Sequence, residues 1–144
     1  MNIKLVNECE YTIRSELVDS DLTYIHQSLQ QTYWAKSRSF EDNQTAFSNS
    51  RAFILTNPQN QILGFARVVT DYAIFAYLAD VYIDDKHRGC GLGKFLIKHI
   101  LLDPKLIKVK KFMLKTQNAQ DLYAKFGFVV PDEYGSIMEK FNHH

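Results

Sequence analysis

One stretch near the middle of the chain constrains its fold more than any other. Residues 77–102 read YLADVYIDDKHRGCGLGKFLIKHILL. β-Branched and aromatic residues come first, glycines alternate in the middle, and apolar residues recur at helical spacing at the end. This pattern predicts a buried strand, a glycine-rich turn and an amphipathic helix, in that order. We expect the rest of the chain to be organised around this strand–turn–helix unit.

The turn of this unit has the properties of an anion-binding site. Gly89, Gly91 and Gly93 alternate in it, so the backbone can approach a ligand without a Cβ atom in the way. The helix that follows offers unpaired N–H groups and the positive end of its dipole at its first turn. A pyrophosphate is therefore the natural occupant.

Two common phosphate-binding patterns do not describe the turn well. The Walker pattern requires a glycine where Arg88 stands and a Ser or Thr where Phe95 stands. The dinucleotide pattern GxGxxG requires a third glycine where Lys94 stands, so it fits only weakly. What fits is R-G-x-G-x-G between a strand and a helix, and the alternative is that these glycines are purely structural.

Length and composition indicate one domain with a core of its own. The chain has 144 residues, of which 46% are hydrophobic, and a domain of this size buries about 70% of its unfolded surface. Its 17 basic and 16 acidic residues argue against nucleic acid or a membrane surface as the main partner. Cys9 and Cys90 form no metal-spaced cluster. No apolar run suits a signal peptide or a membrane span, so the cytoplasm is the default expectation.

The remainder of the chain divides at polar turns into short helices and strands. Helices are expected over 19–31, where Asp and Ser supply the cap, and over 40–47. Asn118 is expected to cap a further helix that ends at Gly127. Hydrophobic runs bounded by turn residues predict strands over 11–18, 51–55, 61–70, 109–114, 128–130 and 136–141.

A second motif lies close to the C-terminus, where residues 122–128 read LYAKFGF. It resembles the L-Y-x-K-x-G-F segment of the GNAT superfamily of N-acetyltransferases, and the glycine turn resembles the acyl-CoA signature R/Q-x-x-G-x-G/A of that superfamily. The run GFARVV at 64–69 is similar to a run that precedes this signature. Because the motifs stand in the family's order, the resemblance covers most of the chain.

The resemblance implies a single N-acetyltransferase domain over residues 1–144 with an α+β fold. In that fold a twisted, mostly antiparallel sheet of six to seven strands carries about four helices. Its central strands splay apart to take up acetyl-CoA, which serves as co-substrate, and no metal is implied.

The resemblance also implies a role for each matching residue. Backbone groups of Val81, Tyr82 and Ile83 are implied to pair with the amide-bearing arm of acetyl-CoA, as an added strand would. Tyr123 is implied to donate a proton to the departing thiolate, or at least to hydrogen-bond the sulfur; the alternative is a tyrosine packed in the core. Main-chain N–H groups are implied to hold the pyrophosphate, and the side chains of Arg88 and Lys94 are implied to add positive charge. These N–H groups belong to Arg88, Gly89, Cys90, Gly91, Leu92, Gly93 and Lys94.

Two features of the family are missing or unresolved in this sequence. Thr116 stands where the family often has an Asn that contacts the cofactor arm, and Asn118 is two residues late for that role. Asp80, on the central strand, is the first candidate for the base that deprotonates the acceptor, directly or through water. It could equally hydrogen-bond a neighbouring loop. Asp71 and Glu41 are weaker candidates for the base.

The predicted reaction is transfer of an acetyl group from acetyl-CoA to a primary amine of a small molecule or peptide, by direct attack in a ternary complex. Neither cysteine sits where a covalent acyl carrier is implied, which favours direct transfer. Two rival functions are a non-catalytic module that senses acyl-CoA and an interaction domain that uses Tyr33 and Trp34. These two aromatic residues belong either to the core or to the wall of an acceptor pocket. Nucleic acid and membranes are not expected as partners, and a homodimer stays open.

Overall fold

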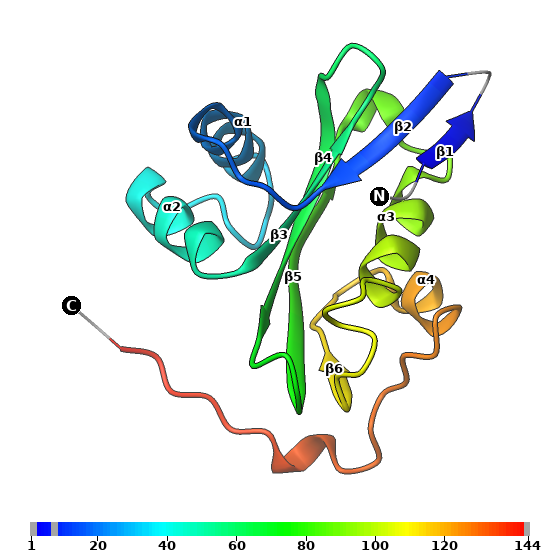
Figure 1. The fold of residues 1–144 in the computed structure, drawn as a ribbon. Coiled ribbons are helices and arrows are strands. Elements are labelled where there is room, and N and C mark those ends of the chain that lie inside the picture. Colours follow the sequence, from blue (N-terminus) through cyan, green and yellow to red (C-terminus); the bar gives the residue numbers. More distant parts are fainter. Residues whose placement is uncertain (1–2, 7–8, 143–144) are drawn as a thin grey trace.

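A six-stranded sheet lies at the centre of the molecule (Figure 1). The computed structural model describes residues 3–6 and 9–142. The strands are β1 (Ile3–Val6), β2 (Cys9–Arg14), β3 (Arg51–Thr56), β4 (Ile62–Thr70), β5 (Phe75–Ile83) and β6 (Lys111–Met113). They lie in the sheet in chain order, and every neighbouring pair is antiparallel except β5 and β6, which are parallel. The α+β class with a mostly antiparallel sheet is confirmed.

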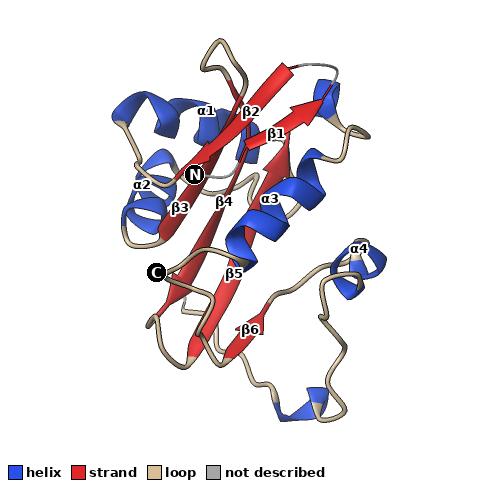
Figure 2. Ribbon diagram, turned by 45° about the vertical axis from the view of Figure 1, so that its right-hand side comes forward, coloured by secondary structure: helices blue, strands red, loops and turns tan. Residues whose placement is uncertain are grey.

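Helices cover both faces of this sheet (Figure 2). They are α1 (Asp19–Leu29), α2 (Phe40–Ser48), α3 (Leu92–Leu101) and α4 (Gln120–Ala124). Strand β3 shows the two layers: Ala52 and Ile54 belong to the core under α1 and α2, whereas Phe53 and Leu55 belong to the core under α3. Successive side chains of a strand point to opposite faces, so an unbroken apolar run suits a strand that is covered on both sides.

A β-bulge interrupts the pairing of β5 with β4. Arg67 pairs with Ala79 but Phe65 pairs with Tyr82, so a single residue of β4 lies opposite two residues of β5. Asp80 takes up the extra length with a φ of +54°, in the left-handed region. Aspartate tolerates this region better than most residues other than glycine.

Because of the bulge, the side chains of β5 that follow it point to the opposite face of the sheet from the one that simple alternation predicts. In an uninterrupted strand Ala76, Leu78 and Tyr82 would share one face. In the structure Ala76 and Leu78 lie in the core under α3, whereas Tyr82 lies in the core under α1 and Val81 packs toward α3. Asp80 therefore faces the side of the sheet that carries α1 and α2.

Strands β5 and β6 stay together for only a short distance. Their pairing joins Phe75–Tyr77 of β5 to Lys111–Met113 of β6, and β5 continues to Ile83 without this neighbour. Beyond Tyr77 the edge of β5 is therefore open toward α4. This separation of the central parallel pair is the splayed geometry that the family resemblance implies.

The C-terminal segment differs from the prediction. Residues 128–130 and 136–141, predicted as strands, form no strand, and a short 3₁₀ turn at Tyr134–Ser136 is the one regular element in this part. Figure 1 shows the segment leaving α4 and passing below the ends of β5 and β6. Val129 and Met138 are exposed. A strand exists only through pairing with a neighbour, and within the described chain this segment pairs with no strand.

The N-terminal part of the chain also differs in detail from the prediction. β1 was not predicted, and β2 ends at Arg14 although the pattern extends the strand through residue 18. Helix α1 begins where expected, and the Asp21 carboxylate accepts a hydrogen bond from the Val18 N–H at 2.9 Å. Across residues 3–6 and 9–142 there is no helix with the length and apolarity needed to cross a membrane.

Candidate active site

The glycine turn between β5 and α3 is built around two left-handed residues. Gly89 has a φ of +84° and Gly91 a φ of +79°, and Gly91 is the N-cap of α3. Other residues adopt this region only at a cost in energy, so the turn itself requires glycine at both positions. A Cβ atom added at Gly89 would meet nothing within 4 Å. The turn is therefore open to solvent, as an anion site must be.

The start of α3 continues directly from the turn. Its N-cap makes no side-chain hydrogen bond to the first turn, and the ten-residue helix places the positive end of its dipole there. The Leu92 side chain is buried in the core, so only its backbone can face a ligand. Arg88, Cys90 and Lys94 are exposed around the same turn.

Arg88 ties the turn to the end of β5. Its Nε donates to the carbonyl of Ile83 at 3.0 Å, and its Nη1 pairs with Asp85 at 2.9 Å. Its guanidinium carbon lies 5.8 Å from the centre of the Tyr82 ring. This arrangement holds a positive charge beside the backbone that the resemblance assigns to the cofactor arm.

Asp80 is the centre of a buried polar cluster. Its Oδ1 accepts from Trp34 Nε1 at 2.9 Å, and its Oδ2 accepts from Arg38 Nη1 at 2.8 Å and from Arg67 Nε at 2.7 Å. Burial alone raises the pKa of Asp80, but the hydrogen bonds and charges of Arg38 and Arg67 outweigh it, and the pKa lies below its ordinary value. The carboxylate is therefore ionised and joins β5, β4 and the connector after α1.

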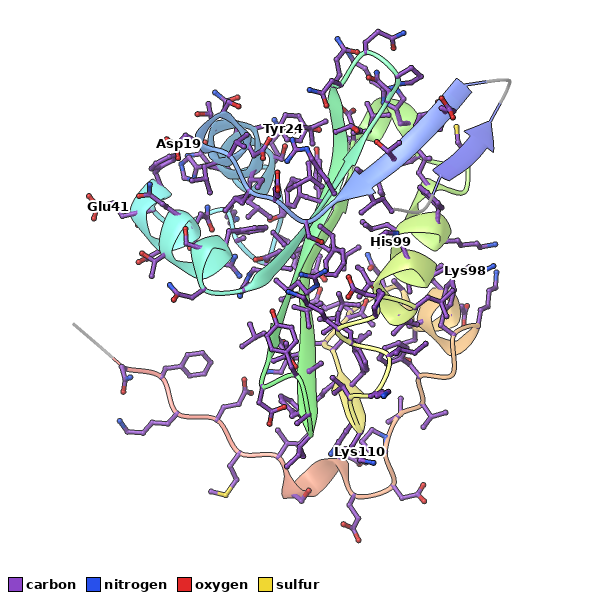
Figure 3. All side chains as sticks on the ribbon, viewed as in Figure 1. Asp19, Tyr24, Glu41, Lys98, His99 and Lys110 are labelled. Atoms are coloured by element: carbon purple, nitrogen blue, oxygen red, sulfur yellow. The ribbon has the colours of Figure 1, made fainter. Side chains whose placement is uncertain are left out.

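These contacts bear on the roles left open for the acidic residues. Asp80 does hydrogen-bond a neighbouring loop, through Trp34 and Arg38. The Asp71 carboxylate accepts from the three N–H groups of residues 73–75 and so stabilises the turn between β4 and β5. Glu41 lies on the outer side of α2, away from β5 (Figure 3). Neither Asp71 nor Glu41 reaches the cleft described below.

Tyr123 is carried by α4 and packs its ring edge-to-face on Phe128, with 5.8 Å between ring centres. Its pKa is raised, first by burial and then by the neighbouring phenol of Tyr33. A raised pKa keeps the hydroxyl protonated at neutral pH, which is the state a proton donor needs. In the described part of the chain the hydroxyl has no hydrogen-bond partner.

A cleft of about 1890 Å³ brings some of these residues together. It runs along the open edge of β5, between the connector after α1 and the region of β6 and α4. Of the residues singled out from the sequence, Asp80, Val81, Tyr82, Arg88 and Tyr123 line it. Ile83 and residues 89–94 do not line it and lie beyond Tyr82 at the end of β5.

Sequence reasoning did not identify Arg38 and Arg67 as residues of the site, and it left open the position of Trp34, which lies in the cleft wall. The available signal was an arginine inside the apolar run of β4. A buried charge implies a partner of opposite sign, and Asp80 is a carboxylate on an equally apolar strand.

Thr116 and Asn118 both line the cleft. The prediction that Asn118 is the N-cap residue of the helix now labelled α4 is wrong. Ala119 is the N-cap residue of α4, and its N–H donates to Thr116 Oγ1 at 3.1 Å. Thr116 thus stabilises the entry to the helix that carries Tyr123. Among the described residues, no group of three or more His, Cys, Asp or Glu side chains is arranged to hold a metal.

Comparison with known proteins gives matches that agree with one another, since both a family model and a solved structure are described as GNAT acetyltransferases. The family model described as an acetyltransferase (GNAT) domain matches residues 48–130. A crystal structure assigned to the GNAT family from Xanthomonas campestris pv. campestris is 36% identical, with a TM-score of 0.84 over 92% of this chain and 93% of that chain.

Two further matches are more limited. A GNAT family acetyltransferase from Elizabethkingia anophelis with acetyl-CoA bound is 21% identical, with a TM-score of 0.66 over 85% of this chain and 78% of that chain. This match supports the fold alone. A histone acetyltransferase from Glycine max is 40% identical over 45 residues, or 31% of this chain, and the match spans 20% of the length of that relative.

Proposed function

Because the chain belongs to the GNAT family of acetyltransferases, we propose that it transfers the acetyl group of acetyl-CoA to a primary amine by direct attack in a ternary complex. The observation that carries the proposal is the cleft along the open edge of β5, lined by Tyr123 on one side, with the glycine turn following β5 beyond the cleft. The glycine turn, the strand edge and the phenol suit the pyrophosphate, the amide-bearing arm and the thioester sulfur, which follow one another in this order in acetyl-CoA.

The turn and the strand fit acetyl-CoA in two respects. The open left-handed turn at Gly89 and Gly91, with the positive end of the α3 dipole beside it, suits a pyrophosphate. We assign this group to the main-chain N–H groups of residues 88–94, with charge from Arg88 and Lys94. The edge of β5 beyond Tyr77 has no strand beside it, so backbone groups at Val81 and its neighbours can pair with the amide-bearing arm.

Acetyl-CoA supplies an activated thioester. Tyr123 donates a hydrogen bond, or its proton, to the sulfur as negative charge develops there, and its raised pKa keeps that proton in place until it is needed. Backbone N–H groups of β5 stabilise charge on the carbonyl oxygen. The cleft holds the amine beside the thioester, and such positioning alone contributes several kcal/mol.

For Asp80 we propose a positioning role. Both of its oxygens already accept hydrogen bonds from arginine or indole donors, and its lowered pKa makes it a weak base. Its effect on the reaction comes through Trp34, Arg38 and Arg67, which it fixes in the wall of the cleft.

A two-step experiment tests the proposal. The melting temperature of the protein is measured with and without millimolar CoA, and release of free thiol from acetyl-CoA is then followed with a panel of amines. We expect a clear rise in melting temperature, since a ligand at 100 times its Kd stabilises by about 2.7 kcal/mol, and thiol release that depends on the amine. Stabilisation without thiol release from any amine would favour an acyl-CoA sensor, and no stabilisation would contradict both functions.

A further inference from the structure

Two arginines from distant parts of the chain meet in the wall of the cleft. Arg38 comes from the connector after α1 and Arg67 from β4, and both line the cleft beside Trp34. Their side chains are 30% and 14% exposed. The carboxylate that joins them belongs to Asp80, whose side chain is 1% exposed.

The charges of this cluster do not balance. Arginine stays protonated at any pH a protein experiences, so Arg38 and Arg67 carry two positive charges and Asp80 supplies one negative charge. Within the described chain, neither arginine forms an ion pair with any other carboxylate. One positive charge is therefore left over in a partly buried site, where it favours an anion.

Both arginines also have N–H groups that form no hydrogen bond within the described residues. Arg38 uses only Nη1, toward Asp80, while Arg67 uses Nε toward Asp80 and Nη1 toward Ser50 Oγ at 3.3 Å. The other N–H groups of both guanidinium ions make no hydrogen bond within the described residues. A guanidinium edge matches the two oxygens of a carboxylate.

The cluster lies on the acceptor side of the cleft. Asp80 is three residues before the end of β5, about 10 Å along the strand from Ile83, and the glycine turn lies beyond Ile83. Tyr33, in the same connector as Arg38, lies close enough to Tyr123 to affect its pKa. An anion held by Arg38 would thus lie near the reacting end of the cleft rather than at the pyrophosphate end.

We propose that Arg38, supported by Arg67, binds a carboxylate of the acetyl acceptor, so that the acceptor is a primary amine that carries a carboxylate, such as an amino acid. This inference rests on the proposed function. The single surplus charge suits a carboxylate better than a phosphate dianion, and Trp34 and Tyr33 offer aromatic surface for the rest of the acceptor.

Matched pairs of amines test the proposal. Thiol release is measured with amino acids and with their amides, which keep the amine and side chain but lack the negative charge. We expect kcat/KM to be roughly tenfold or more higher for the acids, as a charge-assisted hydrogen bond implies. Arg38→Gln should remove this preference, mainly through KM, and leave the Kd for CoA unchanged; Arg38→Lys should restore part of it. Thiol release with phosphoethanolamine, compared with ethanolamine, tests whether the site prefers a phosphate group instead.

Lys36→Gln is the matched control, because it removes an exposed positive charge from the same connector and Lys36 does not line the cleft. It should leave the preference intact. A second measurement needs no turnover: with CoA present, N-acetyl amino acids should raise the melting temperature more than their amides, and Arg38→Gln should abolish the difference. The carboxylate proposal is overturned if neither measurement separates the amino acids from their amides. It is also overturned if the preference for phosphoethanolamine over ethanolamine exceeds the preference for amino acids over their amides. In either case, thiol release with amines that carry no anionic group would leave the proposed function standing.

Discussion

The indole of Trp34 donates a hydrogen bond to the carboxylate of Asp80, with 2.9 Å between Nε1 and Oδ1. This bond fastens the connector after α1 to the middle of β5. It exists because the bulge turns Asp80 toward the face that carries α1 and α2. A local irregularity in one strand thus fixes the wall of the cleft in which an acceptor would bind.

Asp80→Asn should destabilise the fold by roughly 3 kcal/mol, because it leaves two partly buried arginines without their carboxylate. Asparagine has nearly the same shape and also tolerates the left-handed region, so the backbone at the bulge is not strained further. Chemical denaturation at pH 7 measures the change. Asp85→Asn is the control, since Asp85 is 69% exposed in its pair with Arg88 and such pairs contribute about 1 kcal/mol or less. Equal losses from the two variants would contradict the role given to Asp80.

The stability should also fall in acid in a way that depends on Asp80. Its pKa is lowered in the folded protein, so its contribution is fully present above the unfolded value of about 4. The contribution is lost as the pH falls through the lowered folded value. Unfolding free energies measured from pH 6 down to pH 2 should decline less steeply for Asp80→Asn. Parallel curves for the variant and the unchanged protein would mean that the carboxylate is not stabilised in its charged form.

Tyr123→Phe should lower turnover by roughly 100-fold or more, as expected on loss of a positioned proton donor. The Kd for CoA should change little, because the proposed hydrogen bond to the sulfur strengthens only as negative charge develops in the reaction, and the ring itself is kept. Thiol release and CoA titration measure the two effects separately. Turnover within twofold of the unchanged protein would remove Tyr123 from the reaction.

The strand–turn–helix unit was predictable because its signals are local. Alternating glycines, an apolar helical period and a β-branched run each act within a few residues, and β5 and α3 form where these patterns place them. The glycines were interpreted as allowing a ligand to approach closely. The structure adds that Gly89 and Gly91 are also required by their positive φ angles.

The polar cluster was not predictable in the same way. Alternation along β5 would place Asp80 on the same face as Leu78, and only the pairing with β4 creates the bulge that reverses it. Arg38 and Arg67 meet through tertiary contacts that no sequence period encodes. The two strands predicted after residue 127 failed for a related reason, since a strand depends on an edge that the sequence pattern does not reveal.

Gly91→Ala and Gly93→Ala should have opposite effects on the fold, although each adds one methyl group. At Gly91 the methyl meets a φ of +79° and should cost roughly 1–2 kcal/mol. At Gly93 the methyl would meet only Ile83 Cγ1, at 3.9 Å, among the described residues outside its own helix turn, so the helix should gain roughly 0.5–1 kcal/mol.

The same pair tests the turn as a phosphate site. CoA binding should weaken in Gly91→Ala and persist in Gly93→Ala, since alanine at the latter position also fits the signature. Calorimetric titration with CoA measures both affinities on folded protein. Unchanged affinity in a folded Gly91→Ala protein would place the phosphates away from the turn.

Gly64→Ala should destabilise the fold by roughly 2 kcal/mol or more, because the added Cβ has no room. It would lie 2.6 Å from the Tyr82 carbonyl oxygen and 2.8 Å from Ile83 Cδ1. The isoleucine side chain can rotate away, but the carbonyl belongs to the strand paired with Gly64 and cannot move without opening the β4–β5 ladder. Gly135→Ala is the control, since nothing lies within 4 Å of its added Cβ, and denaturation should show a change within about 0.5 kcal/mol. Because Gly64 pairs with Ile83, the last residue of β5 before the segment that leads into the glycine turn, Gly64→Ala should also weaken CoA binding. A folded variant of normal stability would show that β4 and β5 are not held this closely at the end where the phosphates are proposed to bind.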